Sequence, residues 1–539
     1  MAAQRIERAR WGKLAHLVAT VVLVGLHAAL VFLAFTHSPV DVDEGLNLSV
    51  VANVVNGVGY TSDGVYAVAA PHDFEASVTT GPTLILPAVG LHALGLDTVV
   101  AGRIVGVVAY LTLGAGLFAL GRRIAGPWAG LASAASPLLI DVFTNDSSPI
   151  YGPGDLLGEY CVAAFITWAL VLVGRRPVAG FLLLGLAILT KVIAVFAIPA
   201  IVVVFVALRA RREAPISVRM WFAAGLGLVG PTVLFELGKI AVVGPREYVD
   251  VVRGFWSKVG ANPRPTHMMA EKLASLLGAW FVPALVAFVV VVAVAAVLVL
   301  AGALRITGNA RARAAVLTFR SEHAALFLGA LGAALGIVGA WMWLRSTDPL
   351  WLRHPSPGLV VGAGGSIAAL VWAARWLSSR PDPLWRRTGF ATAAVMTVLI
   401  GYSSLVHLAD AGVAQRLGTL GAQRDIAAVI DATGTQEVQG IWGPMVPLAV
   451  MADRPAHSIA LGVDPRALLV FDVYPRAHLA DIGHTLADAM CGDVVLQSTV
   501  ILCWPAPDAQ AQFDALVSQT SSGDLSQVPY ELQPAPSRP

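Results

Sequence analysis

Residues 14–45 of the chain read LAHLVATVVLVGLHAALVFLAFTHSPVDVDEG and join an apolar run directly to a cluster of carboxylates. Leu14–Phe35 is long enough to cross a bilayer, because a membrane helix needs about 20 apolar residues. The run is too long for the core of a signal peptide, and no small-residue cleavage site follows it, so we interpret it as a retained first span. Asp41, Asp43 and Glu44 are therefore predicted to lie where the chain leaves the membrane.

The composition is typical of a membrane protein with several spans. The 539 residues are 57% hydrophobic and 13% charged, whereas an average soluble domain has about 25% charged residues. The formal charge is only +2, and no basic stretch indicates a nucleic-acid partner. Arginine outnumbers lysine by 31 to 5, and this bias, with abundant Ala, Val and Gly, favours a GC-rich genome such as that of an actinobacterium.

The distribution of charge predicts an orientation. Arg5, Arg8, Arg10 and Lys13 precede the first span, and the positive-inside rule then places the N-terminus in the cytoplasm. The first outer loop, 36–97, contains seven acidic residues and no Lys or Arg. Further spans are expected at 98–120, 126–141, 156–174, 178–190, 192–208, 219–240, 273–303, 324–344, 357–378 and 389–408.

Arginine clusters in five later loops agree with eleven spans and an external C-terminus. These loops contain Arg122/Arg123, Arg175/Arg176, Arg209/Arg211/Arg212, Arg305/Arg311/Arg313 and Arg380/Arg386/Arg387. All five fall on the cytoplasmic side if the chain crosses eleven times. The expected fold is an all-α polytopic protein of the cytoplasmic membrane with about eleven transmembrane helices.

Two stretches allow more than one reading. Residues 80–96 are apolar but at the lower edge of spanning length, with two prolines. We expect a half-helix at the outer interface, because a crossing would move the basic loops outside. Residues 178–208 form either one long tilted helix or a hairpin of two short ones. Lys191 in the middle favours the hairpin, with its charge at the outer surface.

The chain changes character after the last expected span. The predicted membrane module is 1–408, and 409–539 has 14 acidic and 6 basic residues with ordinary amphipathic patterning. We expect a small α/β domain outside the membrane, ending in a disordered tail. Cys491 and Cys503 stand on a predicted hairpin there, either as a disulfide, which the compartment permits, or as two buried thiols. Cys161, within a span, is expected to serve packing.

Several stretches of the sequence, taken in order, form a recognisable pattern. The outer loop opens with DVDEG after one span, and NGVGYTSDG and then TTGPTLILPAVGLHALGLDTVVAGRIVG follow. The later stretches are GRRIAGPWAGLASAASPLLI, GEYCVAAFITWALVL, GFLLLGLAILTKVIAVFAIP and WLRHPSPGLVVGAGG. In this order they resemble segments of the GT-C glycosyltransferases, and more closely of the branch of polyprenyl- or dolichyl-phosphate mannosyltransferases and aminoarabinose transferases, whose short proline-containing helix and Arg-bearing span are similar to the second and third stretches. The branch usually has His-Pro-Pro or Pro-Pro where this chain has Thr80-Gly81-Pro82, and Arg-Tyr where it has Arg353-His354.

The resemblance, which covers about 1–380, implies that a sugar such as mannose or arabinose passes from a polyprenyl phosphate to an acceptor hydroxyl, with inversion. A hydroxyl needs a carboxylate base within hydrogen-bond reach. The motif of the family places that base at Asp43, and Glu44 would orient the loop or the acceptor. Mutual repulsion in an acidic cluster raises the pKa of one of its members. The alternative is a solvated helix start with Asp as the cap.

A second acidic group lies across the next outer loop. Asp155 and Glu159 are four residues apart, so on one helix they would share a face at the top of a span. A carboxylate near membrane depth is costly and is a candidate for function. We expect Glu159 to be the stronger acceptor-side candidate, whereas Asp146 has the alternative of a turn residue in TNDSSP.

The lipid phosphate of the donor needs cations at the outer boundary of the membrane. The candidates in this topology are Arg353, Lys191, Arg103, Arg345 and His354. Arginine suits bidentate contact with phosphate, whereas Arg345 or Lys191 could instead extend to the interface, and a lone His is more often structural. The outer loop 241–272 resembles, by position, the loop that covers the donor in related enzymes.

Two other classes remain open at the level of sequence. A transporter or lipid flippase also has many spans with buried charge, although it predicts internal repeats that the chain lacks. A catalytically inactive scaffold of the cell envelope is the third reading. For the transferase we expect a polyprenyl-phosphate sugar as donor, a glycan, lipid or protein hydroxyl as acceptor, membrane lipids as surroundings and no cofactor. A divalent metal is possible at paired carboxylates but not expected.

Overall fold

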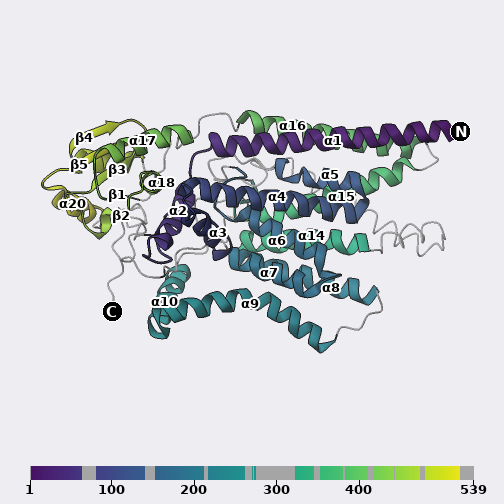
Figure 1. The fold of residues 1–539 in the computed structure, drawn as a ribbon, viewed down its shortest axis with the longest axis horizontal. Coiled ribbons are helices and arrows are strands. Elements are labelled where there is room, and N and C mark those ends of the chain that lie inside the picture. The colour runs from purple at the N-terminus through teal and green to yellow at the C-terminus, as the bar shows by residue number, and fades with distance from the viewer. Residues whose placement is uncertain are drawn as a thin grey trace.

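The computed structural model describes residues 2–62, 74, 80–139, 152–211, 217–261, 270, 272–274, 322–344, 353–379, 383–410, 418–441, 443–473 and 480–521. It has a bundle of long helices with a small sheet-containing domain at one end (Figure 1). Within those residues, seven helices are long and apolar enough to cross a membrane. The predicted polytopic membrane protein is confirmed, and the span expected at 273–303 lies almost wholly outside the described residues.

The helices of the bundle overlap most of the predicted spans, although the first begins at Ala2, before the predicted start at Leu14. The long ones are α1 (Ala2–Thr36), α4 (Thr98–Ala125), α9 (Val218–Val243), α14 (Glu322–Leu344), α15 (Ser356–Ser378) and α16 (Pro383–Asp410), together with α8 (Ile198–Arg211) and the 3-10 helix Val192–Ala197 before it. The shorter ones are α2 (Val42–Val55), α3 (Pro82–Ala93), α5 (Pro127–Ala134), α6 (Glu159–Val173), α7 (Pro177–Thr190) and α10 (Pro245–Ala261). Prolines in the first turns of α3, α5 and α7 have the fixed backbone angle that suits a helix start.

Three local predictions can be compared with the structure. α3 has 12 residues and is about 18 Å long, the length of the predicted half-helix. α7 ends at Thr190, so a continuous helix over 178–208 is ruled out and the predicted break at Lys191 is confirmed. The predicted single span 126–141 is wrong in detail, because α5 stops at Ala134 and the 3-10 helix Ser136–Leu139 follows.

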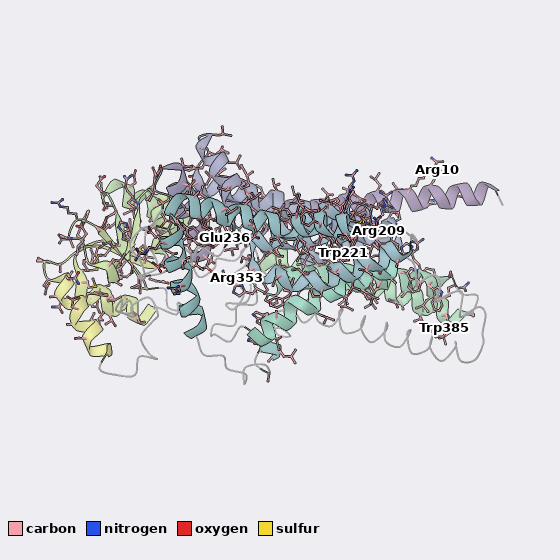
Figure 2. All side chains as sticks on the ribbon, turned by 90° about the horizontal axis from the view of Figure 1, so that it is seen from below. Arg10, Arg209, Trp221, Glu236, Arg353 and Trp385 are labelled. Atoms are coloured by element: carbon pink, nitrogen blue, oxygen red, sulfur yellow. A yellow bond between two sulfur atoms is a disulfide. The ribbon has the colours of Figure 1, made fainter. Side chains whose placement is uncertain are left out.

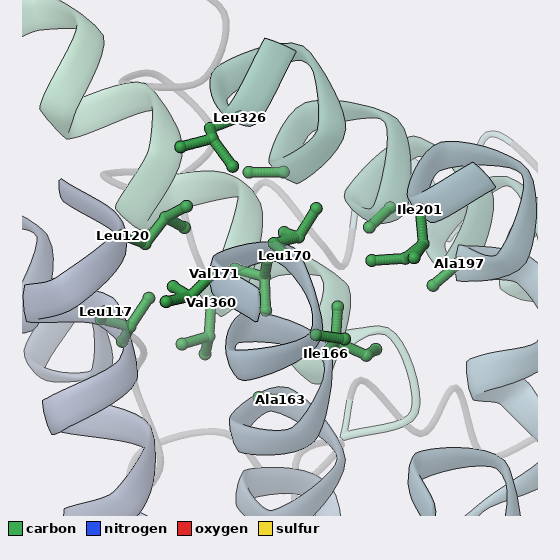
Figure 3. Packing of buried hydrophobic residues seen from close by; sticks show 14 of the residues in the cluster. Leu117, Leu120, Ala163, Ile166, Leu170, Val171, Ala197, Ile201, Leu326 and Val360 are labelled. Atoms are coloured by element: carbon green, nitrogen blue, oxygen red, sulfur yellow. The ribbon is translucent and has the colours of Figure 1, made fainter. Parts of the chain in front are cut away.

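The core of the bundle lies where α4, α6, α14 and α15 meet (Figure 3). Leu117, Leu170 and Leu326 are fully buried there, and Val360 of α15 lies among them. Glycines allow close contact at this junction, since a Cβ on Gly329 would lie 2.9 Å from Cδ2 of Leu170. Tight packing of this kind holds the helix ends that carry charged residues in fixed positions.

Basic segments predicted for one side of the membrane meet at one end of the bundle. Arg123 at the end of α4 pairs with Glu322 at the start of α14. Nη1 of Arg375 donates to the carbonyl of Ala125 at 2.8 Å. Figure 2 places Arg10 and Arg209 toward that same end and Arg353 toward the sheet-containing domain. This grouping agrees with the predicted alternation of the loops.

The C-terminal domain is built on a five-stranded sheet with helices on both faces. Its elements are α17 (Leu420–Ala432), β1 (Val438–Gly440), α18 (Met445–Met451), β2 (Ala456–Ser458), β3 (Leu468–Asp472), α19 (Ala480–Met490), β4 (Cys491–Gln497), β5 (Val500–Pro505) and α20 (Ala509–Ser521). The strand order is β2-β1-β3-β5-β4, with β1 parallel to β2 and β3, and β5 antiparallel to β3 and β4.

Strand β3 divides the domain into two cores by alternation of its side chains. Leu468 and Val470 pack with α17 and α18, whereas Leu469 and Phe471 pack with α19 and α20. The predicted disulfide between Cys491 and Cys503 is present and joins β4 to β5. Leu46 of α2 also enters the first core, so this face of the domain rests on the helix that carries Asp43 and Glu44.

Candidate active site

The acidic residues of the first outer loop begin α2. Asp41 is the N-cap residue, but its side chain makes no capping hydrogen bond. Asp43 and Glu44 follow in the first turn, where negative charge suits the positive end of a helix. Asp41 and Glu44 are buried, so the alternative of a solvated helix start does not describe this cluster.

Arg353 joins this cluster from a distant part of the sequence. It lies just before α15, and its guanidinium contacts the carboxylate of Asp43. Its Nη1 is 3.6 Å from Oδ2 of Asp41. Burial lowers the pKa of Arg353 to about 10 and Asp41 opposes that shift, so the guanidinium stays charged at neutral pH. The arrangement places one arginine between two carboxylates.

Arg103 binds the neighbouring carboxylate, that of Glu44, and is fully enclosed. Nη2 of Arg103 is 3.1 Å from Oε2 of Glu44. The same guanidinium donates to the carbonyls of Ala34 at 3.0 Å and Pro39 at 2.9 Å, and it also reaches that of Ser38. Burial raises the pKa of Glu44 to about 7, and the charge of Arg103 opposes that rise. The sequence predicted that Arg103 contacts the donor phosphate. Because protein acceptors take up these donors, Arg103 is better suited to position the end of α1.

Asp155, Glu159 and Lys191 form a second buried group. Glu159 begins α6, and its Oε1 accepts a hydrogen bond from Nζ of Lys191. The expectation that Asp155 and Glu159 share a helix face is wrong, because Gly158 has a φ of +97° and the helix begins only after it. Burial raises the pKa of Asp155 well above its ordinary range, and the charges of Glu159 and Glu44 add to the rise.

Two carboxylate oxygens of this second group have unused capacity to accept hydrogen bonds. Oδ2 of Asp155 and Oε2 of Glu159 are buried and have no hydrogen-bond partner among the described residues. Unpaired buried acceptors are costly, so a hydroxyl or other donor from a substrate would satisfy them. Within the same described ranges, no three His, Cys, Asp or Glu side chains gather as a metal site would require.

The segment Thr80-Gly81-Pro82 packs against the end of α7, just before Lys191. The amide of Gly81 donates to the carbonyl of Thr190 at 2.9 Å. A Cβ at position 81 would lie only 1.6 Å from the carbonyl oxygen of Leu189. Glycine is therefore required at position 81, since backbone meets backbone there.

Asn47 is a residue of this region that the sequence did not single out. Its Nδ2 donates to the carbonyl of Leu156 at 2.7 Å and to Oγ1 of Thr80 at 3.1 Å. It thereby links α2 to the start of α3 and to the turn that carries Asp155. The sequence did offer one indication of Asn47: it stands four residues after Asp43, a spacing that places both on one face of a helix.

The remaining predicted residues fall in different places. His354 is half-buried beside Arg353, whereas Arg345 and Asp146 lie outside the described residues. Part of the outer loop 241–272 forms α10. Lys272 is a cation that sequence reasoning missed: it is buried, and its Nζ donates to the carbonyls of Trp341 at 3.1 Å and Met342 at 3.3 Å.

Comparisons with known proteins yield a structural likeness. No protein-family model and no curated protein matches the chain. The solved structure of ArnT from Cupriavidus metallidurans bound to undecaprenyl phosphate is 15% identical, with a TM-score of 0.54 over 93% of this chain and 98% of that one. ArnT in the apo state is 14% identical, with a TM-score of 0.49 over 92% of this chain and 98% of that one. At 15% identity the first likeness establishes the fold, which is the fold that the resemblance implied.

Proposed function

We propose that the protein is a glycosyltransferase that moves a sugar from a polyprenyl phosphate to an acceptor hydroxyl at the outer face of the cytoplasmic membrane. The contact of Arg353 with Asp43 carries this proposal, because it brings a phosphate-binding cation and a carboxylate base to one point. The fold of ArnT, which was solved with undecaprenyl phosphate, supports the choice of a lipid phosphate as the donor. The sugar would be a hexose or a pentose, such as mannose or arabinose.

Asp43 is proposed as the general base. Its side chain is 20% exposed, whereas those of Glu44 and Glu159 are at most 1% exposed. An acceptor hydroxyl can therefore approach Asp43 more easily than its neighbours. Removal of the hydroxyl proton by the carboxylate makes the oxygen a better nucleophile as it attacks the anomeric carbon. The bond from that carbon to the phosphate oxygen breaks as the new bond forms, polyprenyl phosphate leaves with the electron pair, and inversion follows from the single displacement.

Donor binding would also activate the base. While Arg353 pairs with Asp43, its positive charge stabilises the carboxylate and weakens it as a proton acceptor. A donor phosphate offers the guanidinium a second anion, and a planar guanidinium binds phosphate well. As the phosphate takes over Arg353, Asp43 becomes more basic. The acceptor is thus activated only when a donor is present.

The other residues are proposed to assist at defined places. Lys191 would supply a second positive charge to the phosphate, with Arg345 and His354 as further candidates. Asp155 and Glu159 would hold the acceptor through their unpaired oxygens. Arg103 would act indirectly, by fixing Glu44 and the end of α1.

The test is a deletion strain examined by mass spectrometry of its cell-envelope glycans and lipid-linked sugars. We expect one polyprenyl-phosphate sugar to accumulate and the corresponding glycan residue to disappear. The wild-type gene should restore the glycan, whereas Asp43→Asn should not. Full restoration by Asp43→Asn would refute Asp43 as the base, whereas a deletion strain with unchanged glycans and lipid-linked sugars would refute the transferase.

A further inference from the structure

We propose that Gln423, in the C-terminal domain, is a positioning residue that holds Asp41 and Asp43 in place for the transfer reaction; this rests on the proposed function. The amide side chain of Gln423 binds both main-chain groups of Val40, the residue before Asp41. The Val40 amide donates to Oε1 at 2.8 Å, and Nε2 donates to the Val40 carbonyl at 3.0 Å. Gln423 is 2% exposed, so water cannot easily replace these bonds.

The segment between α1 and α2 is held from two sides. On the membrane side, Arg103 binds the carbonyls of Ala34 and Pro39. On the other side, Gln423 binds Val40, and the amide of Leu420 donates to the carbonyl of His37 at 3.0 Å. Three hydrogen bonds to this irregular stretch of backbone therefore come from the C-terminal domain.

A second contact joins the same domain to the first turns of α2. A Cβ at Gly45 would lie 2.8 Å from the backbone nitrogen of Pro447 in α18. Only glycine allows this approach, because a side chain would collide with backbone. Leu46 next to it packs into the core of the domain. Asp43 thus stands between two points, Val40 and Gly45, that are both attached to the C-terminal domain.

The partner of these carboxylates belongs to another part of the molecule. Arg353 precedes α15, whose residues lie in the core of the membrane bundle. The geometry of Asp43 with Arg353 consequently depends on how the C-terminal domain holds Val40. A misplacement of about 1 Å of a reacting group can lower a rate by about 100-fold. Gln423 is well placed to prevent such a shift although it touches neither carboxylate in its hydrogen bonds.

The test compares Gln423→Met with a matched variant, Gln439→Met. Gln439 is also a buried glutamine of the same domain. Its Oε1 accepts from the amide of Asp464 at 2.9 Å and its Nε2 donates to the carbonyl of Gly462 at 3.2 Å. Like Gln423, it accepts one main-chain hydrogen bond and donates another, but to two different residues of its own domain. Full-length proteins in lipid nanodiscs would be compared by hydrogen exchange of residues 37–46, by turnover and by donor Kd.

We expect Gln423→Met to speed exchange in 37–46 and to lower kcat by about 10- to 100-fold, with donor Kd unchanged. Gln439→Met should leave both properties as in the wild type. Unchanged exchange in 37–46, or an equal loss of turnover in the two variants, would overturn the inference. If the wild type transfers no sugar from any polyprenyl-phosphate donor, the proposed function fails separately, and exchange in 37–46 still decides whether Gln423 holds the segment.

Discussion

Arg353 contacts the carboxylate of Asp43 although 310 positions separate the two residues in the sequence. Asp43 stands in the first turn of α2, next to the end of the first span, and Arg353 comes just before α15. The pair can form only after the late helices have packed against the early ones. The pair therefore requires a folded membrane bundle. The role of each residue can be tested by replacing it.

Replacement of Arg353 should mainly weaken binding of the donor. Arg353→Ala removes the cation, and we expect a clear loss of affinity for polyprenyl-phosphate sugar. Arg353→Lys should recover only part, because lysine cannot make a bidentate contact with phosphate. Donor binding in nanodiscs measures both. Arg454→Lys is a control, since Arg454 pairs with Asp431 in the C-terminal domain. If neither change at 353 alters donor binding, the phosphate role passes first to Lys191.

Replacement of Asp43 should separate chemistry from binding. Asp43→Asn keeps size and polarity but removes the base, and loss of a general base typically costs about 10²–10⁴-fold in rate. Donor affinity should stay the same or rise, because Arg353 loses a competing anion. Asp431→Asn, which breaks the ion pair with Arg454, serves as the comparison. Turnover and donor Kd are measured together, and near wild-type turnover in Asp43→Asn would move the role to Glu44, Asp155 or Glu159.

Much of the fold could be predicted because its signals are local. Apolar runs indicate the helices, and the half-helix expected within 80–96, where α3 (Pro82–Ala93) lies, followed from its short length, its prolines and the placement of the basic loops. The break at Lys191 followed from a charge within an apolar run. The helix bounds that were predicted wrongly also have local causes. α5 stops at Ala134, although 126–141 reads as one apolar run, and Gly158 delays the start of α6 beyond Asp155.

The sequence indicated the charged residues of the candidate site, but it did not indicate which of them pair with each other. Acid clusters and lone cations are visible in the sequence as residue types at membrane depth. Which cation meets which acid depends on tertiary packing, so nothing local indicated that Arg103 would bind Glu44 and the carbonyls at the end of α1. The same reason hid Gln423, whose partner Val40 lies 383 positions away.

The orientation of the chain in the membrane can be tested with introduced cysteines. Asn56→Cys and Ser518→Cys, at exposed positions, should react with an impermeant maleimide in intact cells. Ser379→Cys, also exposed but at the opposite end of α15 from Arg353, should react only after lysis. The native Cys161 is buried and should give little background. Labelling of Ser518→Cys only after lysis would contradict the eleven-span arrangement.

The buried Glu44 should make stability depend on pH. Its pKa is raised from 4.5 to about 7, so the folded protein binds the proton more tightly than the unfolded chain does. This contribution is fully present below pH 4.5 and is lost as the pH rises through about 7. Glu44→Gln cannot titrate, so its Tm should fall less than that of the wild type across this window. Some slope should remain, because the pKa of Asp155 is raised as well.

Thermal unfolding in detergent across that pH range provides the measurement. Asp431→Asn, at an exposed acid of the C-terminal domain, should give the profile of the wild type. Parallel profiles for Glu44→Gln and the wild type would show that Glu44 does not carry the linkage.

The pair of Glu159 and Lys191 should separate a structural need from a catalytic one. Glu159 is 1% exposed and Lys191 is 13% exposed in their side chains. Removal of one partner leaves a buried charge without compensation, which costs about 3–5 kcal/mol of folding free energy. Glu159→Gln and Lys191→Met should each lower the Tm, whereas the double variant should recover much of the loss. If Lys191 also holds the donor phosphate, the double variant should fold and still bind donor poorly. A double variant that folds and binds donor as the wild type does would limit this pair to a structural role.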